Sequence, residues 1–249
     1  MSAVHSLSRR HLGLIAVTVA GLSACSSATD AGARAGSLSL SVTTRAQAGA
    51  SSDIVIGVGT SPLVVTKAQI VIRKIELLTA SAAAACTDSD DDGCAEVEVG
   101  PALVELPLDA SVSTDLSANV PTGSYRGLEV KIGPVRSGNR RSQSFMAAHP
   151  DFAGRSVRVE GTYEGRSFVF TSDVDTGIEN NFSSPVTIGG AEGVSNLTIA
   201  IDVASWFRNG SSTLDPSNSA NASRIAANIA SSFRAFGDDD HDGFDDRRH

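Results

Sequence analysis

The stretch NLTIAIDV, residues 196–203, alternates apolar residues with polar or small ones and decides the fold class. A period of two places successive side chains on opposite faces of a β-strand. The same alternation recurs in LEVKI (128–132) and in VRVEGTY (157–163). One apolar and one polar face are typical of half-buried strands in an antiparallel sheet. We therefore expect a mainly β protein built from such strands.

A two-residue turn is expected after the third of these strands. Glu164-Gly165 separates Tyr163 from Arg166, which opens a second apolar alternation containing Phe168-Val169-Phe170. Two residues including glycine form the commonest hairpin loop. The sequence predicts a β-hairpin here.

The run from Val64 to Leu78 fits two structures. Its apolar residues match one helical face, but it is also rich in β-branched valine, isoleucine and threonine. β-Branched residues pack well on a pleated sheet. We favour a strand with a bulge near Arg73-Lys74, where two charged residues interrupt the pattern.

Short strands separated by Gly, Pro, Ser and Asn turns indicate an antiparallel β-sandwich, of transthyretin-like or immunoglobulin-like type, over residues 37–215. Ile225, Ile229 and Phe233 then recur every four residues among alanines. This spacing predicts one amphipathic C-terminal helix over residues 216–236, followed by an acidic tail over 237–249.

The first residues have the organisation of a bacterial lipoprotein signal peptide, residues 1–24. A positive segment containing Arg9-Arg10 precedes an apolar stretch that is too short to span a bilayer. Leu22-Ser23-Ala24-Cys25 has the form of a lipobox, in which Cys25 receives the lipid. Residues 25–36 are rich in Ser, Ala and Gly and fit a flexible tether.

The export route has two interpretations. Ser8-Arg9-Arg10-His11-Leu12 partly matches a twin-arginine signal, but two arginines before an apolar stretch also suit ordinary Sec export, which we favour. Ser26 follows the lipidated cysteine in place of the aspartate that retains lipoproteins in the inner membrane. We expect a lipid-anchored protein of the cell envelope, at the outer membrane.

Two cysteines remain after lipidation, Cys86 and Cys94. Exported proteins meet an oxidising compartment, where close cysteines tend to pair. We expect a Cys86–Cys94 disulfide.

The formal net charge is −8, and twelve of the 28 acidic residues lie in two clusters, within 88–98 and 238–246. Nucleic-acid binding requires a basic surface, so this balance argues against it. The excess negative charge is therefore concentrated in these two clusters, which we expect to be loops, and the rest of the mature chain is nearly neutral.

Both clusters have the D-x-D-x-D-G-x-x-[DE] spacing of a calcium loop, because carboxylates at alternate positions converge when the backbone curls and the glycine permits the turn. The candidate ligands are Asp88, Asp90, Asp92 and Glu96 in the first loop and Asp238, Asp240, Asp242 and Asp246 in the second. Neither loop has the bidentate glutamate of an EF-hand. A structural Ca²⁺ ion is the expected cofactor, and solvated acidic loops are the alternative.

No recognised catalytic motif is present, neither a nucleotide-binding glycine loop nor a nucleophile elbow. A hydrolase would have to use His149, the one histidine in the body of the domain. A carbohydrate-binding module would need exposed aromatic platforms, for which Tyr125, Tyr163 and Trp206 are the candidates, although packing roles fit Tyr163 and Trp206 better.

Three runs together resemble a bacterial surface-lipoprotein domain family of uncharacterised function. They are TKAQIVIRKIEL (66–77), PTGSYRGLEV (121–130) and IDVASWF (201–207), and the resemblance spans about residues 38–236. It implies a β-sandwich of transthyretin-like type and no known catalytic residues. We therefore expect a non-catalytic binding or structural module whose partners are the membrane, through its lipid, and an envelope protein or polysaccharide. A hydrolase or carbohydrate-binding module remains the alternative.

Overall fold

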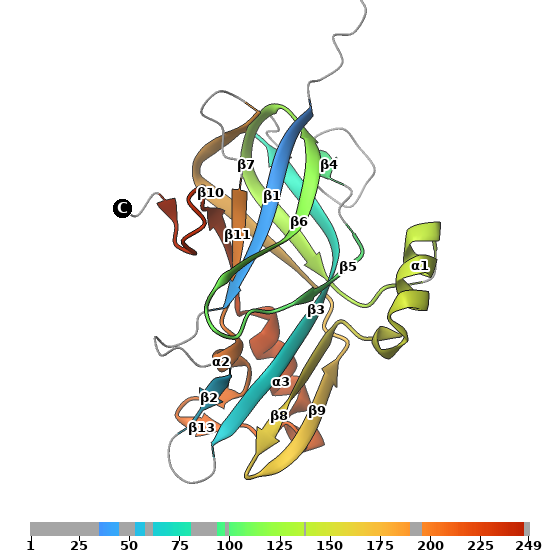
Figure 1. The fold of residues 1–249 in the computed structure, drawn as a ribbon, viewed down its shortest axis with the longest axis vertical. Helices are drawn as coiled ribbons and strands as arrows, with labels where there is room; N and C mark the ends of the chain where they lie inside the picture. The colour runs from blue at the N-terminus through green and yellow to red at the C-terminus, as the bar shows by residue number, and fades with distance from the viewer. Residues whose placement is uncertain are drawn as a thin grey trace, which may run out of the picture. The chain divides into compact units, whose positions relative to one another are not determined.

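Two β-sheets form the fold in the computed structural model, which describes residues 35–44, 53–57, 62–80, 94–97, 100–136, 138–189 and 196–246 (Figure 1). The predicted signal peptide (residues 1–24), Cys25 and the stretch 81–93 lie outside the described residues. The four-stranded sheet runs in the order β14 (Phe233–Gly237), β11 (Asn196–Ile201), β1 (Ala35–Thr44) and β6 (Val112–Pro121).

The second sheet has eight strands. Its connected path is β10 (Thr176–Ile188), β7 (Gly123–Ile132), β3 (Leu63–Thr79), β8 (Val157–Tyr163) and β9 (Arg166–Ser172), with β2 (Ile54–Ile56), β4 (Cys94–Val97) and β5 (Ala102–Glu105) also paired to β3. The minor elements are α1 (Arg140–Ala148), α2 (Val203–Trp206), α3 (Ala222–Ala230), the 3₁₀ turns Pro150–Phe152 and Ser219–Asn221, and the pair β12 (Arg208–Asn209) and β13 (Ser212–Thr213).

The long strand β3 organises the eight-stranded sheet. Its first half pairs with β8 and its second half with β7, while Ile72 is opposite both Ile132 of β7 and Ala102 of β5. A residue with two strand partners has one on each edge, so β5 and β7 flank β3. The register shifts between Ile72 and Lys74, which confirms the bulge predicted near Arg73-Lys74.

The predicted hairpin is confirmed. Tyr163 pairs with Arg166, and both Glu164 (φ 50°) and Gly165 (φ 74°) have left-handed backbones. Positive φ at both central residues is the signature of a type I′ turn, whose twist matches that of the flanking strands.

Side chains from both sheets build one main core, which confirms the mainly β sandwich. Trp206, Phe207, Leu197, Leu128 and Ile70 are among its fully buried members. The rings of Phe168 and Phe170 each meet Phe207 edge-on. Burial of these apolar surfaces is the principal source of stability.

The expectation of half-buried antiparallel strands needs a correction at β11. All six residues of β11 are buried, and β11 runs parallel to β1 while it is antiparallel to β14. Its apolar face lies in the core, and its polar face is also covered. The cover is the C-terminal loop described below.

The C-terminal helix is shorter than the predicted 216–236. Helix α3 ends at Ala230. The chain then reverses, and the Ser232 carbonyl accepts a hydrogen bond from Asp202 N (3.1 Å). β14 then begins with the burial alternation of a strand, with Phe233 buried and Arg234 exposed. Pairing with the open edge of β11 satisfies backbone groups that a longer helix would leave unpaired there.

Helix α1 was not expected from the sequence. Asn139 caps it by accepting a hydrogen bond from Ser142 N (2.9 Å), and Phe145 is its buried residue. Phe145 packs with Phe152, Val71 and Val135 in a second, small core. Too few apolar residues recur in this polar segment for a periodic signal. None of the helices among the described residues is long and apolar enough to cross a bilayer.

Candidate metal site in the C-terminal loop

The outward face of the four-stranded sheet carries polar side chains that are fully buried. Ser41 of β1 and Asn196 and Thr198 of β11 lie on this face. Ser41 Oγ donates to Asn196 Oδ1 (2.9 Å), and Asn196 Nδ2 donates to Thr198 Oγ1 (3.2 Å). Buried polar groups are costly unless they are hydrogen-bonded, so this face requires a polar cover.

The loop after β14, residues 238–246, provides the cover. Asn196 Nδ2 donates to the Asp238 carbonyl (2.7 Å), and Asn196 N donates to Asp239 Oδ1 (3.3 Å). A Cβ added to Gly243 would lie 3.1 Å from Val112 Cγ2 and 3.6 Å from Thr43 Oγ1. The loop therefore reaches from β11 across β1 to the start of β6.

Asp238 anchors this loop from inside. Its side chain has no exposed surface, and its carboxylate accepts three hydrogen bonds. Thr198 Oγ1 donates from β11 (2.6 Å), while Asp242 N (2.9 Å) and Gly243 N (3.1 Å) donate from the loop itself. The buried carboxylate thus holds the curl of the loop and attaches it to the sheet.

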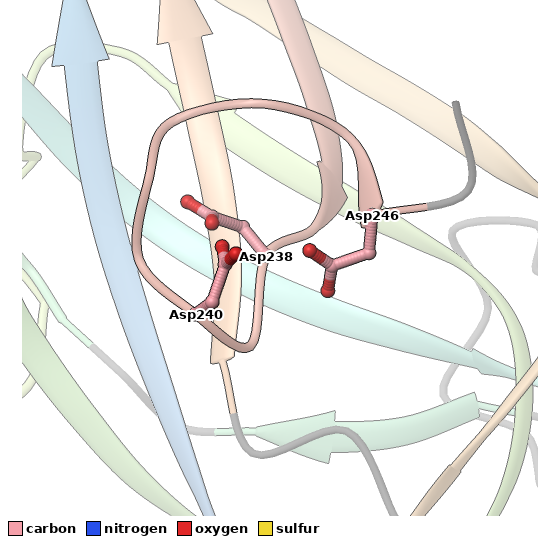
Figure 2. Close-up of side chains that lie close together, drawn as sticks. All are labelled: Asp238, Asp240 and Asp246. Atoms are coloured by element: carbon pink, nitrogen blue, oxygen red, sulfur yellow. The ribbon is translucent and has the colours of Figure 1, made fainter. Parts of the chain in front are cut away.

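Three carboxylates of the loop lie together. One oxygen each from Asp238, Asp240 and Asp246 falls within 4.8 Å of the others, and the latter two residues are exposed. Figure 2 shows Asp246 on the returning limb of the loop, pointing toward Asp238 and Asp240. Hard divalent cations prefer such oxygens, although Ca²⁺ needs six to eight of them. Backbone carbonyls and water would have to complete the shell.

Asp242, the fourth predicted ligand, lies outside this group. Its Oδ1 accepts a hydrogen bond from Phe244 N (2.8 Å), which forms a local turn. The left-handed backbones of His241 (φ 58°) and Gly243 (φ 82°) reverse the chain on both sides of it. The structure therefore brings together three of the four residues chosen by spacing.

The structure describes only the end of the first acidic cluster, at strand β4. Asp88, Asp90 and Asp92 lie outside the described residues, whereas Glu96 belongs to β4, with its Cα opposite that of Glu76 on β3. Calcium binding there stays a prediction, as does the Cys86–Cys94 disulfide, because Cys86 lies outside the described residues.

His149, the histidine that a hydrolase would have to use, lies beside Phe145 and away from the hollow described below. The His149 ring lies 4.8 Å from that of Phe145, and no hydrogen bond joins it to a serine or aspartate among the described residues. A hollow of about 720 Å³ is lined by residues 103, 105–109 and 111–113, with Thr66 and Lys67 of β3. His149 does not line this hollow.

The aromatic candidates are packing residues. Trp206 is fully buried and donates from Nε1 to Ser232 Oγ (2.7 Å). Tyr125 is 2% exposed and donates its hydroxyl to the Pro121 carbonyl (2.6 Å). Tyr163 is partly buried against the core. A sugar-binding platform needs an exposed ring face, which Trp206 and Tyr125 do not offer.

The described residues define a mainly β protein of two large sheets and one two-stranded pair, in which an acidic loop covers a polar sheet face. No protein-family model and no curated protein matches the chain, so the lipoprotein-family resemblance stays a prediction. Among solved structures, MbnP from Methylosinus trichosporium is similar over 75% of this chain and 82% of its own, with 14% sequence identity and a TM-score of 0.41.

Proposed function

We propose that this chain is an exported lipoprotein of the bacterial envelope whose β-sandwich is a non-catalytic binding or structural module. In this proposal the C-terminal loop takes up a structural Ca²⁺ ion. The observation that carries the calcium site is the grouping of Asp238, Asp240 and Asp246 within 4.8 Å, on a loop that is docked to the sheet. Three like charges at this separation repel, and a divalent cation would relieve the repulsion.

The affinity expected for this ion is low. Asp238 already accepts three hydrogen bonds, so its oxygens are shared between the cation and the loop. Asp240 and Asp246 are exposed, and no position-12 glutamate closes the site. We expect a dissociation constant on the order of 10⁻⁴–10⁻³ M, as in extracellular modules. Such a site would be filled in millimolar Ca²⁺ and would hold the loop in place without signalling.

Calcium binding is tested with the double substitution Asp240→Asn/Asp246→Asn. Millimolar Ca²⁺ should raise the Tm of the wild-type protein, because a ligand that binds only the folded state stabilises it, and calorimetry should detect heat. The double variant should lose both effects. Asp242→Asn is the matched control and should keep the response, since Asp242 lies outside the group. No response to Ca²⁺ in the wild type would leave the loop as a structural cover only.

Lipid anchoring rests on Leu22-Ser23-Ala24-Cys25 and is tested with Cys25→Ser. Without the thiol no diacylglycerol can be attached, so the variant should remain unprocessed or leave the detergent phase on partitioning of envelope fractions. The wild type should enter the detergent phase with a mass that includes the lipid. Normal processing and detergent partitioning of Cys25→Ser would contradict the anchor.

A further inference from the structure

The eight-stranded sheet ends at β9, whose outer side is open. β9 pairs with β8, and no second strand pairs with it within the part of the chain that the structure describes. Other outer strands have neighbours from the opposite sheet, since β14 lies against β10 and β6 lies against β4. Among the described elements, only β8 runs along the backbone of β9 (Figure 1).

The register of the hairpin determines which backbone groups of β9 point to the open side. Residues that flank a two-residue hairpin loop, here Tyr163 and Arg166, form a hydrogen-bonded pair, and such pairs alternate along an antiparallel ladder. Every second residue from Arg166 to Ser172 therefore directs its N–H and carbonyl toward β8. The Ser172 carbonyl also accepts a hydrogen bond from Ser156 N (2.9 Å), next to β8, as this alternation requires. The backbone groups of three residues point outward: Ser167, Val169 and Thr171.

This outer side lacks the features that protect most sheet edges. Among the described residues, no hydrogen bond reaches the backbone of these three residues from the outer side, and all three are exposed. Natural edges are blocked by proline, lysine, a bulge or a very short strand. β9 is seven residues long, keeps a regular register with β8 and contains neither proline nor lysine. Its central residue, Val169, is 58% exposed. The edge is therefore able to accept another strand.

The sequence of β9 fits an antiparallel copy of itself. A two-fold axis at Val169 pairs Ser167 of one copy with Thr171 of the other, so all three outward residues exchange backbone hydrogen bonds. On the exposed face Val169 lies opposite Val169, which is a favourable pair of β-branched side chains. On the inner face Phe168 lies opposite Phe170, which extends the aromatic part of the core across the junction.

The charges agree with this pairing. Arg166 is the only charged residue of β9, and the two-fold register places it opposite Ser172 of the second copy. No like charges therefore meet along the strand. Asp173 directly follows Ser172, so each arginine gains a neighbouring carboxylate from the other copy, and both of these residues are exposed.

We propose that β9 is a dimerisation edge, at which two copies of this protein join antiparallel about Val169 into one continuous sheet. The occupant is a second copy because the outward hydrogen-bonding groups, the side-chain pairs and the charges of β9 all match their own antiparallel arrangement. One strand from each copy supplies the contact, and interfaces below about 1,200 Å² are typical of weak or transient complexes. The dimer fraction should therefore rise with protein concentration. The inference depends neither on calcium nor on the lipid anchor.

Val169→Cys tests the two-fold register directly. In a hydrogen-bonded antiparallel pair the opposite Cα atoms are about 5.5 Å apart, so a short bis-maleimide should link two copies of the purified full-length variant. Val55→Cys, which replaces a valine of β2 that is 51% exposed, is the matched control and should give no dimer above the wild-type background. Equal yields from the two variants would overturn the register. Linkage in cell extracts only to a protein of another mass would assign the edge to a different partner and would also overturn the proposal.

Val169→Lys tests the dimer in solution. Two lysines opposite each other repel, and an edge lysine blocks strand addition, so sedimentation should show dimerisation at least about tenfold weaker than in the wild type. The Tm at low protein concentration should stay near that of the wild type, because the side chain is exposed. Val55→Lys adds the same charge on β2 and should dimerise like the wild type. A wild type that remains monomeric up to about 1 mM, or a Val169→Lys variant that dimerises as strongly as the wild type, contradicts the proposed edge.

Discussion

Replacing Gly161 with alanine is expected to lower the free energy of unfolding by about 3 kcal/mol, the upper part of the range for overpacked sites. Gly161 of β8 is opposite Val65 of β3, and the register shifts at the next position, where Lys67 faces Glu160. A Cβ on Gly161 would overlap the carbonyl oxygen of Val64 and press on the Phe168 ring. A backbone carbonyl cannot move aside without breaking the ladder, so β8 and β3 would have to separate.

Urea unfolding followed by circular dichroism measures this effect, with Gly138→Ala as the control. Gly138 has an ordinary backbone and no neighbour within 4 Å of an added Cβ, so its substitution should leave the midpoint nearly unchanged. Similar midpoints for the two variants would show that β8 does not approach β3 as closely as described.

Replacing Asp238 with alanine is expected to cost about 3 kcal/mol or more, because a buried donor that loses its acceptor costs about 1–3 kcal/mol. Thr198 Oγ1 and Gly243 N lose this acceptor, and Asp242 N loses the shorter of its two hydrogen bonds and keeps the longer one to Asp240 Oδ1 (3.3 Å). The loop should then leave the sheet and expose Asn196 and Thr198. Hydrogen exchange should show faster exchange of the β11 and β14 amides in the variant.

The matched control for Asp238 is Asp240→Asn, with both variants measured in chelator. Asp240 belongs to the same acidic group but is exposed, so its substitution should change the free energy of unfolding by less than about 0.5 kcal/mol. Equal losses for the two variants would indicate that repulsion within the loop, and not the anchoring of Asp238, controls its stability. Thr198→Val should show part of the Asp238→Ala effect, since it removes one of the three donors.

Part of the candidate site could be predicted from the sequence. The alternating aspartates and Gly243 identified the loop, because a curled backbone with this spacing directs carboxylates inward. Sequence spacing also selected Asp242, which instead accepts a hydrogen bond from Phe244 N. It did not reveal that Asp238 is buried beneath the loop, because that depends on Thr198, which is 40 residues away along the chain.

The sequence by itself determined the local structure: the period of two in the strands, the Glu164-Gly165 turn and the bulge after Ile72. These features depend on neighbouring residues, whose backbone and side-chain preferences act without the rest of the chain. Only the tertiary structure decided which strands are neighbours. Two pairings join residues distant in sequence: the parallel pairing of β1 with β11, and the antiparallel pairing of β3 with β7, which places Glu76 opposite Glu129. The polar face of β11 illustrates the difference. Its sequence pattern is that of a solvent-exposed face, but in the structure the loop anchored by Asp238 covers it. Periodicity records which residues share a face, whereas burial depends on what packs against that face.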